Sequence, residues 1–584
     1  MVLKTNMIQR MRRITLPGWL RDSLASLSAV GLIVAILFFA ASLTPSLVPR
    51  TTLMQGVLSG VAMGIGYALG AFGFWLWHYL ELPEPRVRFQ RLVMRVAIVI
   101  CMVAVVSFLW RAGEWQNSIR VLMDMELLGG PDLGLLGLVS LGVFTLLLAL
   151  GRVFHLVFRA VSGWTGQHIP RRIANVTGLV VAALLFWTVI EGVLFSQALR
   201  LADASFQQLD ALLDAEMAPP ADERQTGSDA SLISWEALGR AGRNYVVSGP
   251  SVAELEAFLD EPAQKPLRVY VGLNSAESIE ARAELALAEL QRAGGFERAV
   301  LVIATPTGTG WLDPAAMDTL EYLQRGDVAT VAVQYSYLPS WLSLLAESEY
   351  GAETAQAVFK RVYDYWRRLP EDERPRLYLH GLSLGAMNSQ RAADIYDVIA
   401  DPFDGALWSG PPFRSTMWRQ ITRMRQPDSP AWLPRFRDGS IVRFANQYGG
   451  LERPEASWGP LRIIYLQYAS DPITFFEPEI LYRRPEWLES PRGPDVSEEL
   501  RWYPVVTMLQ LAVDMGAGDN VPPGYGHVFA ARDYIRAWAE LLDPPDWDEA
   551  GLAGLRSHYE QLRGPAGRRS VSPEDVRAIL PAPR

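Results

Sequence analysis

The sequence is poor in the residues that form disulfides, thiolate metal sites and nucleic-acid surfaces. Cys101 is the only cysteine among the 584 residues, which excludes an intrachain disulfide and a thiolate metal site. The net charge is −9 and no basic stripe with interleaved aromatic residues occurs, so nucleic acid is not expected as a partner. Histidines are few and scattered in the first half, and neither a metal nor an organic cofactor is expected.

Hydrophobic residues are abundant instead, at 50% of the chain with a mean hydropathy of +0.10. They crowd the first 200 residues, whereas the remainder has the composition of an ordinary globular chain. A chain of this length exceeds one compact core. We therefore predict a transmembrane helical domain at 1–200, a linker and packing segment at 201–265, a globular α/β domain at 266–545 and a C-terminal tail at 546–584.

Five apolar segments of the first region are long enough to cross a bilayer, which takes about 20 apolar residues. They lie at 24–44, 55–79, 92–110, 133–157 and 174–197. The first segment is not interpreted as a cleavable signal peptide, because its apolar run is long and further spans follow it. The sequence therefore predicts an all-α transmembrane bundle.

Basic residues mark alternate connections between these segments. The N-terminal stretch and the connections near 86–91 and 152–172 are rich in arginine, whereas Arg50 stands alone in its connection and 111–132 mixes both charges. Basic loops stay cytoplasmic. We therefore expect a multi-pass protein of the cell (inner) membrane with a cytoplasmic N-terminus and an extracytoplasmic C-terminal half.

Two features of the spans allow alternative interpretations. The repeats Gly60/Gly64 and Gly66/Gly70 indicate close helix packing within the bundle or, alternatively, a homodimer contact, so the oligomeric state stays open. Glu191 is either an interfacial carboxylate or a group that handles protons or substrate.

Beyond residue 266, short apolar runs alternate with helical periods. Strands are predicted at Val269–Gly272, Ala299–Ala304, Ala329–Gln334, Leu377–His380, Ala406–Trp408 and Ile463–Gln467. Strands that alternate with helices predict a mostly parallel sheet covered on both faces.

One turn in this region carries the pattern Gly-x-Ser-x-Gly. The strand RLYLH runs directly into Gly381–Gly385, and a helical stretch follows. A sharp strand–turn–helix of this kind holds the serine in a strained conformation and exposes its hydroxyl, while side chains at the flanking glycines would collide with neighbouring backbone. Ser383 is therefore the predicted nucleophile; alternatively, it merely caps the helix.

A nucleophilic serine needs a base and an acid. His527, in the loop VPPGYGH before a helix, is the predicted base, because His380 should be buried beside the turn and His558 lies in the charged C-terminal region. Asp471, at the end of the strand LRIIYLQ, is the predicted acid. Asp514 and Asp519 are its competitors, and Asp471 is alternatively a turn residue before proline.

An oxyanion hole needs backbone N–H groups. One is expected from Leu384, and the other from the loop TPTGTGW at one of Thr307, Gly308, Thr309 and Gly310. The same loop is not a nucleotide site, because no Gly-Lys-Ser/Thr follows it and the third glycine of a dinucleotide fingerprint is missing.

Taken together, the multi-span N-terminal region and the motifs WEALGRAGRNYVVSGPS, TPTGTGW, HGLSLGAMNS, ASDPI and VPPGYGHVF resemble a bacterial family of membrane-anchored α/β-hydrolases. The resemblance implies an α/β-hydrolase-like catalytic domain and a triad of Ser383, Asp471 and His527. The stretch YPVVTMLQLAVDMG departs from the general pattern, because a helix is predicted where a last strand normally precedes the histidine.

The expected activity is hydrolysis of a small-molecule or lipid ester, in or near the membrane, through an acyl-enzyme. Aromatic residues suited to an apolar acyl site are Tyr335, Tyr337, Trp341, Trp408, Phe475 and Phe476. Two alternatives are an acyltransferase that uses the same triad and a non-enzymatic envelope component with a vestigial hydrolase fold.

Overall fold

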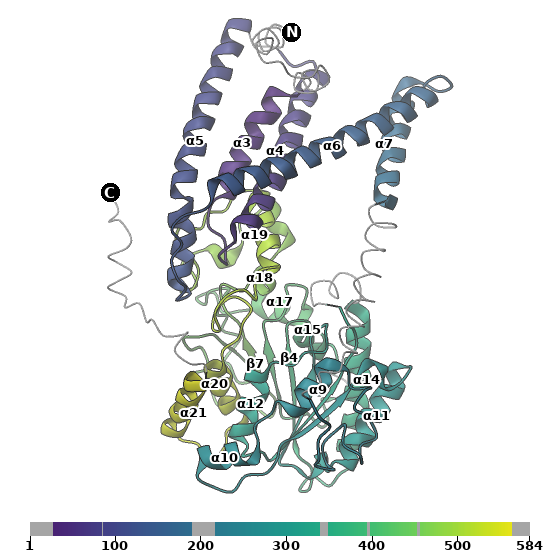
Figure 1. Ribbon diagram of the computed structural model, residues 1–584, viewed down its shortest axis with the longest axis vertical. Coiled ribbons are helices and arrows are strands. Elements are labelled where there is room, and N and C mark those ends of the chain that lie inside the picture. The colour runs from purple at the N-terminus through teal and green to yellow at the C-terminus, as the bar shows by residue number, and fades with distance from the viewer. Residues whose placement is uncertain are drawn as a thin grey trace. The chain divides into compact units, whose positions relative to one another are not determined.

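Two compact units make up the computed structural model, which describes residues 27–83, 86–189, 217–338, 348–393, 398–452 and 456–562 (Figure 1). The first unit comprises Met1–Leu194 together with Pro478–Arg484 and Ser497–Asp514. The second unit comprises Phe195–Glu477, Pro485–Val496 and Met515–Arg584. Two short segments of the C-terminal half therefore belong to the first unit.

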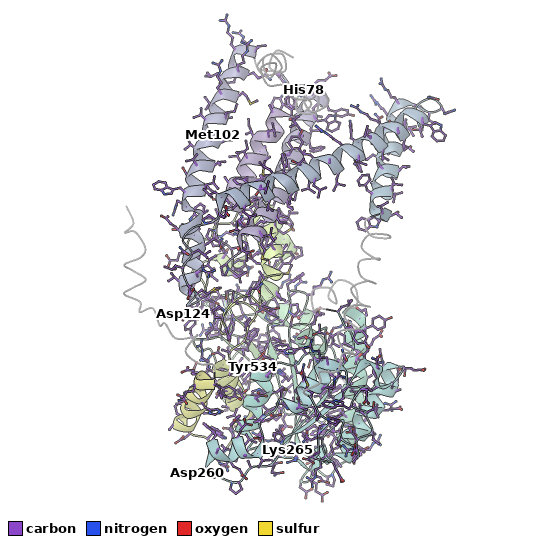
Figure 2. All side chains as sticks on the ribbon, viewed as in Figure 1. His78, Met102, Asp124, Asp260, Lys265 and Tyr534 are labelled. Atoms are coloured by element: carbon purple, nitrogen blue, oxygen red, sulfur yellow. The ribbon has the colours of Figure 1, made fainter. Side chains whose placement is uncertain are left out.

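Apolar helices build the first unit. In chain order they are α3 (Ala29–Ser42), α4 (Thr52–Tyr79), α5 (Val87–Leu122), α6 (Leu133–Thr165), α7 (Arg171–Trp187) and α19 (Val506–Met515). Large apolar side chains of α5 and α6 point outward, as Met102 does with an exposed fraction of 60% (Figure 2). An apolar surface of this extent on long helices indicates association with a membrane.

The number of spans differs from the five that the sequence predicts. In the part of the chain that the structure describes, three helices are long and apolar enough to cross a membrane: α4, α5 and α6. Helix α3 has 14 residues, because it begins after its cap Ser28 and ends ahead of Pro45. Its length of about 21 Å is shorter than a hydrocarbon core of about 30 Å. Helix α7 has 17 residues and begins with two arginines, while the predicted residues 190–197, including Glu191, lie outside the described residues.

The small-residue repeats of α4 pack against neighbouring helices of the same unit. A Cβ placed on Gly60 would lie 2.6 Å from Cβ of Val143 in α6, and one placed on Gly70 would lie 2.9 Å from Cα of Gly31 in α3. Since both distances are shorter than van der Waals contact, only glycine permits these approaches. The interpretation as helix packing within the bundle is thus confirmed.

A parallel sheet forms the centre of the second unit. Its strands are β1 (Leu267–Val271), β2 (Val300–Thr305), β3 (Val328–Val333), β4 (Arg376–Leu382), β5 (Gly405–Ser409), β6 (Val442–Ala445) and β7 (Arg462–Leu466). They lie in the order β1-β3-β2-β4-β5-β7-β6, and every pairing is parallel. The strands are buried along almost their whole length, as expected for a sheet that helices cover. The predicted fold class is confirmed.

Two groups of helices pack on this sheet (Figure 1). Helix α11 (Ile279–Arg292) contacts β1 and β3 and packs with α14 (Ser348–Trp366), while α20 (Ala531–Leu542) contacts β5 and β7 and packs with α12 (Pro314–Leu323). The second unit also contains α9 (Gly239–Val247), α10 (Val252–Leu259), α15 (Leu384–Gln390), α17 (Thr416–Arg423), α18 (Pro472–Phe475) and α21 (Glu549–Leu562).

The stretch before His527 is indeed helical, because α19 occupies Val506–Met515. The position beside β7 at the edge of the sheet is taken by β6, which precedes β7 in the chain. The chain between β7 and the histidine loop therefore contains helices of both units, α18 and α19, and no further strand of the sheet.

Candidate active site

A one-residue turn joins β4 to α15. Strand β4 ends at Leu382 and α15 begins at Leu384, so Ser383 alone makes the reversal, with φ 56° and ψ −123°. A positive φ on a residue other than glycine costs about 1–3 kcal/mol and is typical of functional turns. The Ser383 N–H donates to the carbonyl oxygen of Ser409 at 2.9 Å, which fixes the turn to the end of β5.

The two glycines of the motif are required by close backbone contacts. A Cβ placed on Gly381 would overlap the backbone of Gly385 and Ala386, and one placed on Gly385 would overlap the carbonyl oxygen of Thr305. The predicted collisions are therefore present on both sides of Ser383. They also show that the end of β2 lies directly against the turn.

His527 and Asp471 form a buried hydrogen-bonded pair. Nδ1 of His527 lies 2.8 Å from Oδ2 of Asp471, and the Asp471 carboxylate is fully buried. Its oxygens also accept hydrogen bonds from the N–H groups of Ile473 and Thr474 and from the Thr474 hydroxyl. These bonds hold the carboxylate in one orientation, and the carboxylate holds the imidazole.

The other ring nitrogen of His527 is available for proton transfer. Nε2 is buried and has no hydrogen-bond partner among the described residues. Burial alone would lower the pKa of His527, but the charge and hydrogen bond of Asp471, with smaller contributions from Asp519 and Asp313, outweigh it and raise the pKa above its ordinary value. A raised pKa makes the imidazole a stronger base.

The imidazole lies at the same end of the sheet as Ser383. A Cβ placed on Gly410 would come within 2.7 Å of Cε1 of His527, the ring carbon next to Nε2. Gly410 follows Ser409, the residue to which the Ser383 N–H is bonded. The structure therefore places Ser383 and Asp471 at the carboxyl ends of β4 and β7 and the ring of His527 beside the end of β5, where parallel sheets carry their sites, without a hydrogen bond between Nε2 of His527 and the Ser383 hydroxyl.

A polar network links the loop of Asp471 to the loop of His527. The Ser470 hydroxyl accepts a hydrogen bond from the Gly526 N–H at 2.9 Å and donates to Oδ2 of Asp495 at 2.6 Å. Gln447 donates to the same Asp495 oxygen and to the carbonyl oxygen of Gly524. Sequence reasoning missed this network, although Ser470 and Gly526 each adjoin a predicted site residue.

The amides predicted for an oxyanion hole differ in what they already bind. Leu384 is the first residue of α15, where N–H groups lack intrahelical acceptors. In the TPTGTGW loop, the Thr307 N–H donates to the Trp311 carbonyl and the Gly310 N–H donates to the Thr307 carbonyl, both at 3.0 Å. The turn thus uses the Thr307 and Gly310 amides itself, which favours Thr309 among the predicted residues of this loop as the second donor.

The remaining candidate histidines and acids lie elsewhere. His380 is buried in β4 with Nδ1 2.9 Å from the Leu407 carbonyl oxygen, and burial lowers its pKa to about 4. Nε2 of His558 in α21 lies 3.3 Å from the Tyr322 hydroxyl. Asp514 in α19 accepts backbone N–H groups of the first unit, and Asp519 is exposed.

Most of the predicted acyl-site aromatics are buried in the core. Trp408 donates from Nε1 to the Ser389 hydroxyl and packs on Tyr465, and Tyr335, Tyr337 and Phe475 are also buried. Trp341 lies outside the described residues. A small pocket of about 10 Å³ lies between Tyr335 and the ends of β2 and β3, with room for about one water.

The parallel sheet, the strained serine turn and the buried acid–histidine pair define a hydrolase-type α/β fold. Residues 267–555 match the alpha/beta-hydrolase family, and residues 43–250 match the N-terminal region of that family. The chain belongs to this alpha/beta-hydrolase family. No curated protein and no solved structure matches the chain.

Proposed function

We propose that this protein is a membrane-anchored serine hydrolase that cleaves a carboxylic ester through an acyl-enzyme. One observation carries the proposal. The imidazole of His527 lies at the same end of the sheet as Ser383 and is hydrogen-bonded through Nδ1 to Asp471 at 2.8 Å, while its Nε2 has no partner among the described residues. Acyl transfer needs a nucleophile, a base that takes its proton, and an acid that orients the base.

In the proposed reaction, Nε2 of His527 accepts the proton of the Ser383 hydroxyl as Oγ attacks the ester carbonyl. The N–H groups of Leu384 and of Thr309 stabilise the oxyanion. The protonated imidazole then gives its proton to the departing alcohol. The acyl group stays bound to Oγ of Ser383. Water resolves the acyl-enzyme, with His527 again as the base.

The proposed substrate is a lipid or envelope ester, because three apolar helices associate the chain with a membrane. Such a substrate is held near the surface by its acyl chain, so anchoring the enzyme raises the encounter rate. The distribution of basic residues supports an extracytoplasmic catalytic domain.

Covalent labelling of the full-length protein in detergent with a fluorophosphonate probe tests the proposal. We expect wild-type protein to be labelled and Ser383→Ala to remain unlabelled, while the control Ser440→Ala, a serine in the loop before β6, is labelled like wild type. Absence of labelling on folded wild-type protein, or equal labelling of Ser383→Ala, would refute the proposal.

A further inference from the structure

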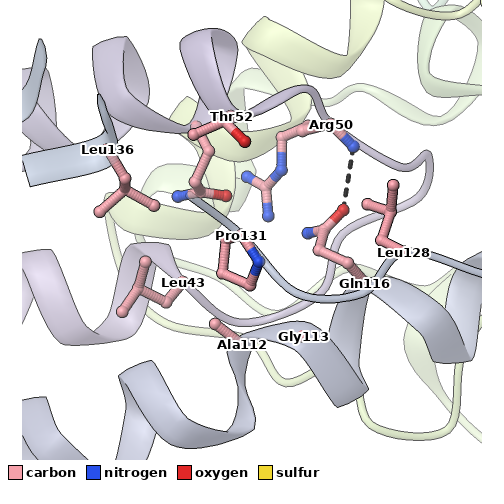
Figure 3. Close-up of a pocket in the computed structure, with 10 residues that line it drawn as sticks. Leu43, Arg50, Thr52, Ala112, Gly113, Gln116, Leu128, Pro131 and Leu136 are labelled. Atoms are coloured by element: carbon pink, nitrogen blue, oxygen red, sulfur yellow. Dashed lines mark hydrogen bonds between the residues drawn. The ribbon is translucent and has the colours of Figure 1, made fainter. Parts of the chain in front are cut away.

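A second polar site lies wholly within the first unit, apart from the serine turn. It is a pocket of about 30 Å³, which holds roughly two water-sized atoms. Apolar side chains form its wall, and four polar residues line it: Arg50, Thr52, Gln55 and Gln116. Figure 3 labels Arg50, Thr52 and Gln116 among them. Arg50 lies in the connection between α3 and α4, and Gln116 comes from α5.

Arg50 brings a buried positive charge to this pocket. Its side chain is 3% exposed, and Nη2 donates to the Thr44 carbonyl oxygen at 2.7 Å. Nε and Nη1 have no hydrogen-bond partner among the described residues. Because a guanidinium has five N–H groups, three of them are left for a ligand. Leaving buried N–H groups unpaired is destabilising, so the Nε and Nη1 groups suit a polar ligand in the pocket.

Gln116 adds further donors, and Gln55 adds an acceptor. Oε1 of Gln116 accepts the Arg50 backbone N–H at 3.0 Å, as Figure 3 shows, which turns the amide nitrogen Nε2 away from that bond. This Nε2 and Oε1 of Gln55 are buried without partners in the described part of the chain. The pocket therefore offers five unused N–H groups and one unused oxygen, counted from three on Arg50 and two on Gln116. Such a donor excess suits an anion with several oxygens.

A protein carboxylate does not use these donors. Asp514 is the acid whose charge acts on Arg50, but its Oδ2 accepts the N–H groups of Leu47 and Val48, and its Oδ1 has no hydrogen-bond partner among the described residues. Among the described residues, no ion pair joins Asp514 to Arg50. The charge of Asp514 thus reduces the cost of burying Arg50 without occupying the pocket.

The pocket lies at the level where the apolar part of α5 ends. The stretch from Arg111 onward is polar, and Trp110, directly before it, is 83% exposed, as expected for a tryptophan at a membrane interface. The first turn of α4 also borders the pocket through Thr52, and a helix N-terminus favours negative charge. Tryptophans of a membrane interface lie at the level of the lipid headgroups, which carry the phosphates.

We infer that the pocket formed by Arg50, Gln55 and Gln116 binds a phosphate group, carried by an anionic lipid headgroup or free in solution. Two phosphate oxygens fill the space for two water-sized atoms, and the Arg50 and Gln116 N–H groups donate to them. This site is independent of the proposed hydrolysis, because none of its residues belongs to the serine site.

Native mass spectrometry and thermal unfolding of the full-length protein test the inference. The lipid arm uses nanodiscs of phosphatidylcholine with or without phosphatidylglycerol, and the free-anion arm adds inorganic phosphate to protein in a neutral detergent. The test variants are Arg50→Gln, which removes the charge, and Gln116→Leu, which removes the amide but keeps the charge. The control is Arg120→Gln on the same end of α5, where Arg120 donates to the Glu126 carbonyl oxygen.

We expect wild-type protein and Arg120→Gln to bind one of the two probes, and both test variants to bind it at least about ten-fold more weakly, as loss of a charge-assisted hydrogen bond predicts. Retention of phosphatidylglycerol identifies the lipid headgroup, and stabilisation by inorganic phosphate alone identifies the free anion. The inference is overturned if wild-type protein binds neither probe, or if Gln116→Leu and Arg50→Gln bind as tightly as wild type. Gln116→Leu keeps the test valid where Arg50→Gln fails to fold.

Discussion

At the scale of single residues, Asp471 controls how the imidazole of His527 titrates. Burial is the largest single effect and favours the neutral ring, but the charge and hydrogen bond of Asp471, with smaller contributions from Asp519 and Asp313, together outweigh it and raise the pKa of His527. Sequence order favours Asp471 among three candidate acids, and Asp471 is the one that is hydrogen-bonded to His527. The Ser470–Asp495 network could not be predicted, since Asp495 and Gln447 are brought to the site by folding alone.

The pH dependence of labelling by a fluorophosphonate probe follows from this balance. The base works only when neutral, and its pKa is raised, so the labelling rate rises with pH and its half-maximum lies above the value of about 6.5 for free histidine. Asp471→Asn removes the effect that raises the pKa and leaves the effect of burial. We therefore expect the half-maximum to move to lower pH and the plateau rate to fall by roughly 10³-fold or more.

Asp519→Asn is the matched control for that measurement. Asp519 is exposed and makes only a smaller contribution to the pKa of His527. Its replacement should leave the plateau rate near the wild-type value and move the half-maximum only slightly downward. A large loss of rate in Asp519→Asn with near-normal labelling of Asp471→Asn would assign the acid role to Asp519.

At the scale of elements, six of the seven strands follow from sequence pattern, and β6 does not. Each predicted strand holds at least three apolar residues in succession, whereas Val442–Ala445 is short and is interrupted by Arg443. This arginine is buried because it pairs with Glu540 and lies over the Trp458 ring at 3.9 Å. Partners that are distant in sequence thus turn a polar position into a core position, and periodicity cannot reveal them.

A substitution at Gly385 tests the close backbone contact at the serine turn. Gly385→Ala would place a methyl group against the Thr305 carbonyl oxygen, so backbone at the turn or at the end of β2 must move. We expect at least about 2 kcal/mol of destabilisation and loss of probe labelling. Gly554→Ala in α21 is the control, because no atom lies within 4 Å of the added Cβ. A helical Gly→Ala change in open space should stabilise by about 0.5–1 kcal/mol. Normal labelling of Gly385→Ala would show that the turn tolerates displacement.

A similar pair of substitutions tests packing among the apolar helices. Gly60→Ala in α4 would bring a methyl group within 2.6 Å of Val143 Cβ and 2.7 Å of the Ser140 carbonyl oxygen, whereas Gly73 in the same helix has nothing within 4 Å. Helix α6 must therefore move away from α4 in the first variant only. We expect a lower melting temperature in detergent for Gly60→Ala and an unchanged or higher one for Gly73→Ala. Equal melting temperatures would show that α4 and α6 do not pack closely in the membrane.

At the scale of the whole molecule, the first unit contains segments from the C-terminal half, although the composition of the chain divides at about residue 200. Gln510 in α19 donates to the Thr44 carbonyl oxygen at 2.9 Å, across 466 residues of sequence. The hydropathy pattern separates the N-terminal spans from the α/β region, but it does not identify the segments of the second half that pack with the first unit. Such contacts depend on the fold of both regions and not on a local pattern.

The side of the membrane on which the serine turn works depends on the segment after α6. The connection near 166–172 is basic and predicts a cytoplasmic position, whereas 198–265 is acidic. The positive-inside rule therefore predicts that the chain crosses between them. Alkaline phosphatase fused after residue 128 or residue 220 should be active, and the same enzyme fused after residue 168 should be inactive. Equal expression of the three fusions is checked with an antibody against alkaline phosphatase. An inactive fusion after residue 220, together with an active one after residue 128, would place Ser383 on the cytoplasmic face and restrict its substrate to esters that are accessible from that side.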